Sequence, residues 1–372
     1  MKRKNILIDI KTVIPLYTIG YITGIGRSTY ELLKALHELE LPFDITLFSQ
    51  NTRGVTAKKE FPKFKYLHFY VPDRPLFRRV LEFFKLKYLL TNYSLLHLPN
   101  NTQQEPEIEE RTIYTIHDLA VCEFPEMWGV ENNKKFFEDL KRKLLLCKGI
   151  ITCSEYSRQS IIKFAGVNPN KVTTIPWGVN QEVFKPTFDE EVLNKYHITP
   201  NFFFTSSCNH PRKNAPILLQ AYIQYLNNGG QRQLVMLNPL DNQIESYHDL
   251  IKNNKIKILR NVTDHELVAL YSYAHCSFVL SSFEGFGLPI IESLACGTQV
   301  VSSRNTSLPE VGGDVVLYIN NLDVEELYRI LEKIDHLPKD ILLDKNKCNK
   351  LLKKFTWNSC ARAYCDFYNQ ML

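Results

Sequence analysis

Two glutamates, Glu284 and Glu292, flank a glycine-rich turn that comes before a predicted helix. Gly285 and Gly287 let a ligand approach the backbone closely, and Pro289 suits a first helical turn because the amide it lacks has no partner there. The first amides of such a helix attract anions, above all phosphate. Carboxylates beside an anion site make electrostatic sense if they bind hydroxyl groups, so we interpret the segment as a site for a phosphorylated, hydroxyl-rich ligand. The alternative is an ordinary Gly-Pro helix start with two incidental acids.

A basic pair, Arg212 and Lys213, follows the apolar run 202–207 and comes directly before another predicted helix. A guanidinium offers two parallel hydrogen bonds and an ammonium offers a point charge, so the pair suits a diphosphate. The alternative is a solvated basic pair, which is disfavoured because cations oppose the dipole at a helix N-terminus.

A glycine pair in the first half, Gly24 and Gly26, opens a predicted helix and looks at first like a dinucleotide-binding fingerprint. Thr29 replaces the third glycine, and the pair lies well beyond the end of the first predicted strand, where the fingerprint requires an immediate turn. We therefore interpret the pair as a flexible loop that closes over a ligand from the opposite domain. A Rossmann-type dehydrogenase is disfavoured for the same reason.

A histidine, His117, follows the predicted strand 112–116 and is itself followed by Asp118. At the carboxyl end of a parallel strand such a histidine is positioned to contact a ligand. A structural histidine bonded to its neighbour is the alternative, and the residues alone leave both open.

Short apolar runs alternate with helical patterns along the chain, which predicts buried parallel strands covered by helices. The predicted strands are 5–10, 43–48, 66–71, 95–98, 112–116, 150–153 and 172–175, then 202–207, 234–237, 257–259, 277–280, 299–302 and 315–319. The segment 176–186 breaks the alternation and predicts a hinge between domains. We therefore predict an α/β protein with two doubly wound domains, in which ligands bind beyond the carboxyl ends of the strands.

The composition is that of an ordinary globular protein: 372 residues, 44% apolar and 23% charged, with 15 Gly and 18 Pro. It excludes a largely disordered or collagen-like chain. Nine cysteines without a Cys-x-x-Cys pair, mostly inside apolar runs, indicate buried reduced thiols. No run approaches the roughly 18 apolar residues of a membrane span, and no signal-peptide core follows Met1, so we expect a cytoplasmic protein.

The net charge of +5 is unevenly distributed, because residues 1–178 carry 26 Lys and Arg against 19 Asp and Glu. Residues 74–87 interleave basic side chains with leucine and phenylalanine, which suits a helix lying at an anionic bilayer surface. A core helix with a charged edge is the favoured interpretation, because apolar residues occupy too much of the circumference for an interfacial stripe. Peripheral contact with the inner membrane face is the alternative hypothesis. Nucleic acid is not an expected partner, since no recognised binding module accompanies the charge.

In this order, the motifs resemble those of family-4 retaining glycosyltransferases, which have the GT-B fold. The resemblance covers nearly the whole chain and includes the spacing of Glu284 and Glu292. Its other elements are GIGR at 24–27, HD at 117–118, SEYS at 154–157, IPWGVN at 175–180, FKP at 184–186, PRKN at 211–214, ACGT at 295–298, LPEVGGD at 308–314 and FTW at 355–357.

The resemblance implies a role for each matching residue. Arg212 and Lys213 would hold the donor diphosphate, Glu292 the ribose and Glu284 the transferred sugar, while His117 would approach that sugar from the N-terminal domain. The further donor contacts that it implies are Gly26 and the backbone of Val262, Gly285, Phe286, Gly287 and Leu288. Many members carry an earlier basic residue where this chain has Ser-Cys-Asn at 207–209, and the pattern here is similar to that of mannosyl- and rhamnosyl-type members.

The implied architecture is GT-B, with two Rossmann-like domains facing across a cleft. Residues 1–178 would form the acceptor-binding domain and residues 179–356 the donor domain, while the helix 357–372 crosses back onto the first. The implied activity is retaining transfer of a hexose, such as mannose or rhamnose, from a nucleotide-diphosphate sugar to a hydroxyl of a glycan or lipid-linked acceptor, in surface polysaccharide synthesis.

No metal and no cofactor are expected, because Arg212, Lys213 and a helix N-terminus would neutralise the leaving diphosphate. Two alternatives share the donor site: a GT-B sugar-nucleotide epimerase or hydrolase, and a non-catalytic nucleotide-sugar-binding subunit. The subunit would be expected to lack the basic pair or one glutamate, and this chain has all of them.

Overall fold

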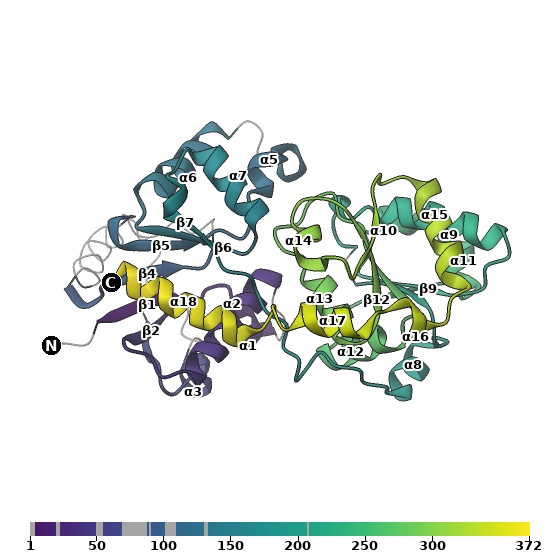
Figure 1. The fold of residues 1–372 in the computed structure, drawn as a ribbon, viewed down its shortest axis with the longest axis horizontal. Helices are drawn as coiled ribbons and strands as arrows, with labels where there is room; N and C mark the ends of the chain where they lie inside the picture. The colour runs from purple at the N-terminus through teal and green to yellow at the C-terminus, as the bar shows by residue number, and fades with distance from the viewer. Residues whose placement is uncertain are drawn as a thin grey trace. The chain divides into compact units, whose positions relative to one another are not determined.

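The computed structural model describes residues 4–19, 23–49, 55–68, 88, 91–100, 109–129, 133–206 and 208–372. The chain divides into two compact units (Figure 1). Unit 1 comprises Met1–Gly178 together with Trp357–Leu372, and unit 2 comprises Val179–Thr356. The basic segment 74–87, with its predicted helix, lies outside the described residues.

The described part of unit 1 is built on a seven-stranded parallel sheet in the order β3-β2-β1-β4-β5-β6-β7. Its strands are β1 (Asn5–Asp9), β2 (Asp44–Ser49), β3 (Lys65–His68), β4 (Leu95–Leu98), β5 (Thr112–Thr115), β6 (Gly149–Thr152) and β7 (Val172–Thr174). In register, Ile8 of β1 lies opposite Leu47 of β2 and His97 of β4. The strand order reverses between β1 and β4, which makes this a doubly wound sheet.

Helices accompany this sheet, and their starts follow local capping rules. The side chains of Asn133 and Ser154 accept hydrogen bonds from backbone amides in the first turns of α6 and α7. The helices are α1 (Ile14–Ile19), α2 (Gly24–Glu38), α3 (Val55–Glu60), α5 (Ala120–Glu123), α6 (Lys134–Leu146), α7 (Glu155–Ala165) and α18 (Trp357–Met371), with 3₁₀ turns η2 (Glu109–Arg111), η3 (Pro125–Trp128) and η4 (Pro169–Lys171).

The helix α18 belongs to unit 1 although unit 2 precedes it in the chain, and it lies against α2 (Figure 1). Two of its tyrosines reach buried polar groups of the sheet. The hydroxyl of Tyr368 is 2.7 Å from Nδ1 of His97, and the hydroxyl of Tyr364 is 3.2 Å from Oγ1 of Thr115. Because buried polar groups need partners, this network fixes where the helix docks.

Unit 2 carries a six-stranded parallel sheet among its described residues, in the order β10-β9-β8-β11-β12-β13. Its strands are β8 (Phe203–Thr205), β9 (Leu234–Leu237), β10 (Ile256–Leu259), β11 (Cys276–Val279), β12 (Gln299–Ser303) and β13 (Leu317–Ile319). The order reverses between β8 and β11. Ligands of doubly wound sheets bind at that switch point, so the loops after β8 and β11 are the candidates for a site.

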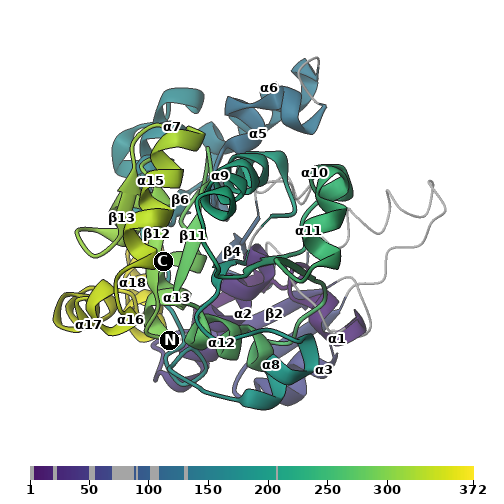
Figure 2. The same cartoon turned by 90° about the vertical axis from the view of Figure 1, so that its right-hand side faces the viewer.

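The helices of unit 2 are mostly short, and α9 and α15 lie side by side (Figures 1 and 2). Thr263 and Glu266 form a reciprocal capping box at the start of α12. The stretch 241–252 is not one continuous helix, because a 3₁₀ turn separates α10 from α11. The helices are α8 (Glu190–Tyr196), α9 (Ala215–Asn227), α10 (Asp241–Ile244), α11 (His248–Lys252), α12 (Asp264–Tyr273), α13 (Leu288–Ala295), α14 (Leu308–Gly312), α15 (Val324–Asp335), α16 (Lys339–Leu342) and α17 (Lys345–Leu352), with 3₁₀ turns η5 (Pro211–Lys213) and η6 (Glu245–Tyr247).

Each unit has its own apolar core. In unit 1 it includes Leu7, Ile116 and Ile150, and in unit 2 it includes Phe203, Tyr222 and Phe278. Across the described ranges, we find no helix long and apolar enough to span a bilayer.

Candidate active site

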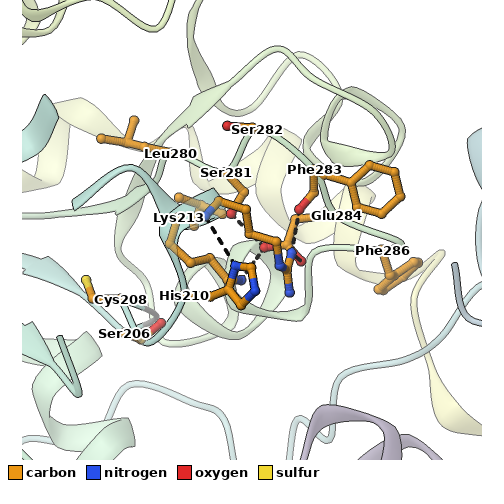
Figure 3. Close-up of polar contacts among 12 residues, drawn as sticks. Ser206, Cys208, His210, Lys213, Leu280, Ser281, Ser282, Phe283, Glu284 and Phe286 are labelled. Carbon is orange, nitrogen blue, oxygen red and sulfur yellow. Dashed lines mark hydrogen bonds and ion pairs between the residues drawn. The ribbon is translucent and has the colours of Figure 1, made fainter. Parts of the chain in front are cut away.

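The basic pair and the first glutamate meet at the switch point of unit 2. Figure 3 shows Lys213 beside Glu284. Arg212 and Lys213 lie in η5 after β8, and Glu284 lies in the loop between β11 and α13. The guanidinium of Arg212 is 2.9 Å from Oε2 of Glu284, and the ammonium of Lys213 forms an ion pair with Oε1. Two cations and one carboxylate leave a net positive charge, which suits an anionic ligand.

The carboxyl of Glu284 is held in its ionised form. Burial acts to raise its pKa, but the charges of Lys213 and Arg212, with hydrogen bonds from Lys213 and Ser281, outweigh burial and lower the pKa to about 2. The hydroxyl of Ser281 donates to Oε1 at 2.6 Å. Glu284 is therefore an acceptor at neutral pH and not a proton donor.

Lys213 is the more enclosed member of the basic pair. Only 8% of its side chain is exposed, against 21% for Arg212. The ion pair with Glu284 explains how an ammonium is tolerated at this depth.

A left-handed residue, Asn214 (φ 53°), joins η5 to α9 and ties the two loops together. Its side-chain Nδ2 donates to the carbonyl of Leu280 at 2.6 Å and to the hydroxyl of Ser282 at 2.8 Å. The amide of Ser282 in turn donates to the carbonyl of Arg212 at 2.8 Å. Asparagine tolerates this conformation better than most residues and can bond locally. The loops after β8 and β11 thus form one connected structure.

The helix α13 begins at Leu288, directly after this loop, and Gly287 (φ 117°) is its N-cap. A Cβ at this position would lie 2.8 Å from Cδ2 of Leu308, so both the backbone conformation and the space require glycine. The predicted donor contacts Gly285, Phe286, Gly287 and Leu288 occupy the turn and the first position of α13.

The second glutamate, Glu292, lies inside α13 and is 8% exposed. It neighbours Tyr271 of α12, whose hydroxyl donates to Oγ of Ser206 at 2.7 Å, just beyond the end of β8. Burial and the charge of Glu292 raise the pKa of Tyr271 well above its usual value. Glu284 and Glu292 therefore have different surroundings: the first is paired with cations and the second lies near a neutral phenol. Val262 is half-buried and follows β10, the outer strand on this side of the sheet.

In unit 1, His117 follows β5 and is buried, with 4% exposure. Its Nε2–H donates to the carbonyl of Pro99 at 3.0 Å, whereas Nδ1 has no hydrogen-bond partner among the described residues. The ring lies 5.2 Å from that of Trp177, and both line a small cavity of about 10 Å³. Burial lowers the pKa of His117 to about 4, so the imidazole is neutral at pH 7 with an acceptor nitrogen to offer.

The prediction of a flexible loop at Gly24 and Gly26 is wrong. These residues form the first turn of α2, where the hydroxyl of Thr23 accepts a hydrogen bond from the amide of Gly26 at 3.3 Å. The N-cap stabilises a helix start where the glycine pair suggested mobility. Gly26 is buried there.

Three groups around Glu284 were not anticipated from the sequence: the hydroxyls of Ser281, Thr306 and Ser307. Thr306 and Ser307 come from the loop after β12, more than 20 residues further along the chain. The only signal at 303–307 is a polar run, Ser-Arg-Asn-Thr-Ser, which is typical of any surface turn.

Comparison with known proteins bears on both units. The family model described as Glycosyltransferase Family 4 matches residues 22–183, and the model described as Glycosyl transferases group 1 matches residues 188–351. The O-antigen chain mannosyltransferase B of Escherichia coli is 28% identical over 370 residues, which cover 93% of this chain and 96% of that protein. The serotype-specific mannosyltransferase WbdA of Escherichia coli is 26% identical over 70% of this chain, but the chain spans only 34% of that protein.

A solved structure shows the same fold over nearly the whole length. The complex of Anabaena Alr3699/HepE with UDP-glucose superimposes with a TM-score of 0.73 at 17% identity, covering 98% of this chain and 99% of that chain. The solved structure shows the GT-B fold, and the two family models together with the mannosyltransferase relatives identify a nucleotide-sugar-dependent glycosyltransferase. Given the two matching models, the chain belongs to the GT4-type glycosyltransferases. The predicted fold class and enzyme class are confirmed.

Proposed function

We propose that this enzyme transfers mannose, with retention, from a nucleoside-diphosphate mannose to a hydroxyl of a glycan or lipid-linked acceptor in surface polysaccharide synthesis. The observation that carries the proposal is the convergence of Arg212, Lys213 and Glu284 at the switch point of unit 2. The nearly full-length similarity to an O-antigen mannosyltransferase supports mannose over other hexoses and supports the polysaccharide context.

The two cations act on the leaving group. Cleavage of the bond between the sugar and the diphosphate builds negative charge on the leaving oxygen, and Arg212 and Lys213 stabilise that charge. Preorganised charges in a partly buried site need little reorganisation during the reaction, which makes them effective. Because these residues and the N-terminus of α13 supply the neutralisation, the reaction needs no metal.

The two glutamates divide the donor between them. Glu284, ionised and next to the cations, accepts hydrogen bonds from hydroxyls of the sugar, and Glu292 accepts them from the ribose. The separate surroundings of these carboxylates support this division. The backbone of Gly285, Phe286, Gly287 and Leu288 serves the sugar and diphosphate, and the turn at Val262 serves the base.

Unit 1 binds the acceptor, and His117 contributes a neutral contact to the sugar. Its unpartnered Nδ1 supports this role, because a buried acceptor atom without a partner is unfavourable unless a ligand or water meets it. Gly26, in the first turn of α2, is the other contact proposed for unit 1.

The test begins with a thermal-shift panel of UDP, GDP, UDP-glucose, GDP-mannose and dTDP-rhamnose. A ligand at 100 times its Kd adds about 2.7 kcal/mol to the free energy of unfolding, which shifts the melting temperature measurably. We expect GDP and GDP-mannose to give the largest shifts.

Product analysis then follows with GDP-mannose and an aryl α-mannoside as the acceptor. An α-linked dimannoside supports the proposal. Release of free mannose without acceptor would identify a hydrolase, and conversion of the sugar nucleotide without acceptor would identify an epimerase.

The reaction takes place at the cytoplasmic face of a membrane if the acceptor is lipid-linked, and the basic segment 74–87 is our candidate for contact with that surface. A flotation assay tests this with vesicles containing one-third anionic lipid, using neutral vesicles as the control. Substitution of Arg78 and Arg79 by Gln should abolish flotation with the anionic vesicles. Equal recovery of both proteins would show that the segment has no such role.

A further inference from the structure

The peptide of Glu284 is anchored on both sides by one neighbouring loop, which connects β12 to α14. The amide of Glu284 donates to Oγ1 of Thr306 at 3.0 Å, and its carbonyl accepts from the hydroxyl of Ser307 at 2.8 Å. The same hydroxyl lies 2.9 Å from the carbonyl of Phe286. Ser307 has no exposed surface, so water does not compete for these bonds.

The conformation of Thr306 singles this loop out. Its φ is 51°, in the left-handed region, where a β-branched residue is a genuine outlier. Glycine or asparagine would adopt this φ more easily, but glycine has no side chain to receive the amide of Glu284. Strained residues persist where the surrounding structure fixes them, and they cluster at active sites.

Further contacts hold the loop against the segment that begins at Ser281. The hydroxyl of Ser303 donates to the carbonyl of Ser281 at 2.5 Å, and Nδ2 of Asn305 lies 3.4 Å from the same oxygen. Leu308 packs beneath Gly287, closely enough to exclude a side chain there. The end of β12, the loop after it and the first residue of α14 therefore support the segment 281–287 along its length.

We propose that Thr306 and Ser307 are positioning residues, which fix the peptide of Glu284 so that its carboxylate stays in register with Arg212, Lys213 and the sugar. The inference rests on the proposed role of Glu284 in binding the sugar. A carboxylate on a loop can rotate with its peptide, and a displacement of about 1 Å at a reacting group can lower a rate by up to about a hundredfold. Tying both the amide and the carbonyl removes that freedom. Neither hydroxyl needs to touch the substrate.

The test compares Thr306→Val, which removes the hydroxyl and keeps the β-branched shape, with Thr306→Ser, which keeps the hydroxyl. For transfer from GDP-mannose to an aryl α-mannoside, we expect Thr306→Val to lower kcat about threefold to tenfold and Thr306→Ser to stay near the wild type. Calorimetry with GDP should give the same Kd for all three proteins, because the bare nucleotide lacks the sugar.

A double-mutant cycle then shows whether Thr306 acts through Glu284. In a Glu284→Gln background, which by itself should lower kcat tenfold or more, Thr306→Val should cause no further loss. An equal fold-loss in both backgrounds would overturn the proposal. If Glu284→Gln keeps the wild-type kcat, the role of Glu284 itself is wrong, and the two failures are thus distinguishable.

Hydrogen exchange tests the proposal without an activity assay. Hydrogen exchange in peptides spanning 281–287 should be faster in Thr306→Val than in Thr306→Ser, because the amide of Glu284 loses its acceptor. Unchanged exchange would contradict the proposal even if the sugar nucleotide used by the enzyme were not GDP-mannose. If Thr306→Val does not fold, Ser307→Ala carries the kinetic and calorimetric expectations, because it removes the donor to the carbonyl of Glu284. Ser307 makes no side-chain cap bond to α14, so its loss leaves that helix start intact.

Discussion

Each unit places a buried titratable side chain beyond the end of a parallel strand, and the two environments are opposite in kind. In unit 2, Glu284 is paired with Arg212 and Lys213, and its pKa is lowered to about 2 although burial opposes ionisation. In unit 1, His117 and His97 lie among neutral groups, and burial lowers their pKa to about 4 and about 3. One cluster is fully charged at pH 7 and the other carries no charge.

The difference shows which unit can stabilise negative charge. A cluster with two fixed cations can oppose negative charge that develops on a leaving group, whereas neutral imidazoles provide only hydrogen bonds and shape. The contrast supports leaving-group chemistry in unit 2 and uncharged contacts in unit 1. Four experiments test this contrast between the units.

The largest effect is expected from Lys213→Ala. Removal of one such preorganised donor lowers turnover about 10²- to 10³-fold. The variant should also lose stability, because Glu284 is left buried with one cation in place of two. Steady-state kinetics at saturating donor measure the first effect and urea unfolding the second. Arg329→Ala, which removes a cation from an exposed pair with Glu325, is the matched control. Turnover equal to that of the control would refute the role of Lys213.

The second experiment lowers the pH to distinguish the stability of the two units. Because the pKa of His117 is lower in the folded protein than its ordinary value of 6.5, the unfolded chain binds a proton that the native unit does not. The free energy of unfolding therefore falls as the pH drops from 6.5 towards 4, by about 2 kcal/mol at pH 5 from His117 alone. Glu284 contributes stability that is lost only between about pH 4.5 and pH 2.

Tryptophan fluorescence isolates unit 1 in this test, since Trp128, Trp177 and Trp357 all lie within it. Urea unfolding followed by fluorescence should give a lower free energy of unfolding at pH 5 than at pH 7. The loss should be smaller in His117→Gln, which cannot titrate in this range. Equal values for the wild type at both pH values would show that the histidines are not held neutral by the fold.

A smaller effect should separate the two glutamates. Glu292→Gln should weaken GDP binding about tenfold and raise KM, because the ribose contact exists in the ground state and the transition state alike. Glu284→Gln should lower turnover while GDP binds at least as tightly as to the wild type, since the change removes a negative charge beside Arg212 and Lys213. Calorimetry on both variants decides the matter. Weaker GDP binding by Glu284→Gln alone would mean that the assigned roles are reversed.

No effect is expected from chelation. Transfer should proceed at the same rate in EDTA, because the proposal has Arg212, Lys213 and the N-terminus of α13 neutralise the charge of the diphosphate. Loss of activity in EDTA, with recovery on addition of magnesium or manganese, would make the proposed metal-free mechanism wrong.

Sequence reasoning found those features of the site that are encoded locally. Arg212, Lys213 and Glu284 each follow an apolar run that reads as a strand, and parallel strands bring such residues to one edge of a sheet. The caps Ser154 and Thr263 were predictable for the same reason, because a cap bonds within its own helix.

The missing parts depend on tertiary contacts. Thr306 and Ser307 reach Glu284 because β12 pairs with β11, and a polar turn gives no sign of the strand beside which it will lie. The polar sequence neighbours of Lys213 give no sign of its burial, which accompanies the ion pair with Glu284, 71 positions later. The Gly24 and Gly26 segment misled us because glycine permits a loop without requiring one, and Thr23 caps a helix there.

The return of α18 to unit 1 has a consequence for the order in which the protein matures on the ribosome. Residues 179–356 are continuous in the chain, so unit 2 can fold as soon as it emerges. Unit 1 starts first but must wait, because Tyr364 and Tyr368, which satisfy Thr115 and His97, are synthesised after all of unit 2. Until then its sheet carries uncovered histidine and threonine groups, and the nascent chain holds a complete unit 2 beside an unfinished unit 1. Docking of a single helix therefore completes the enzyme.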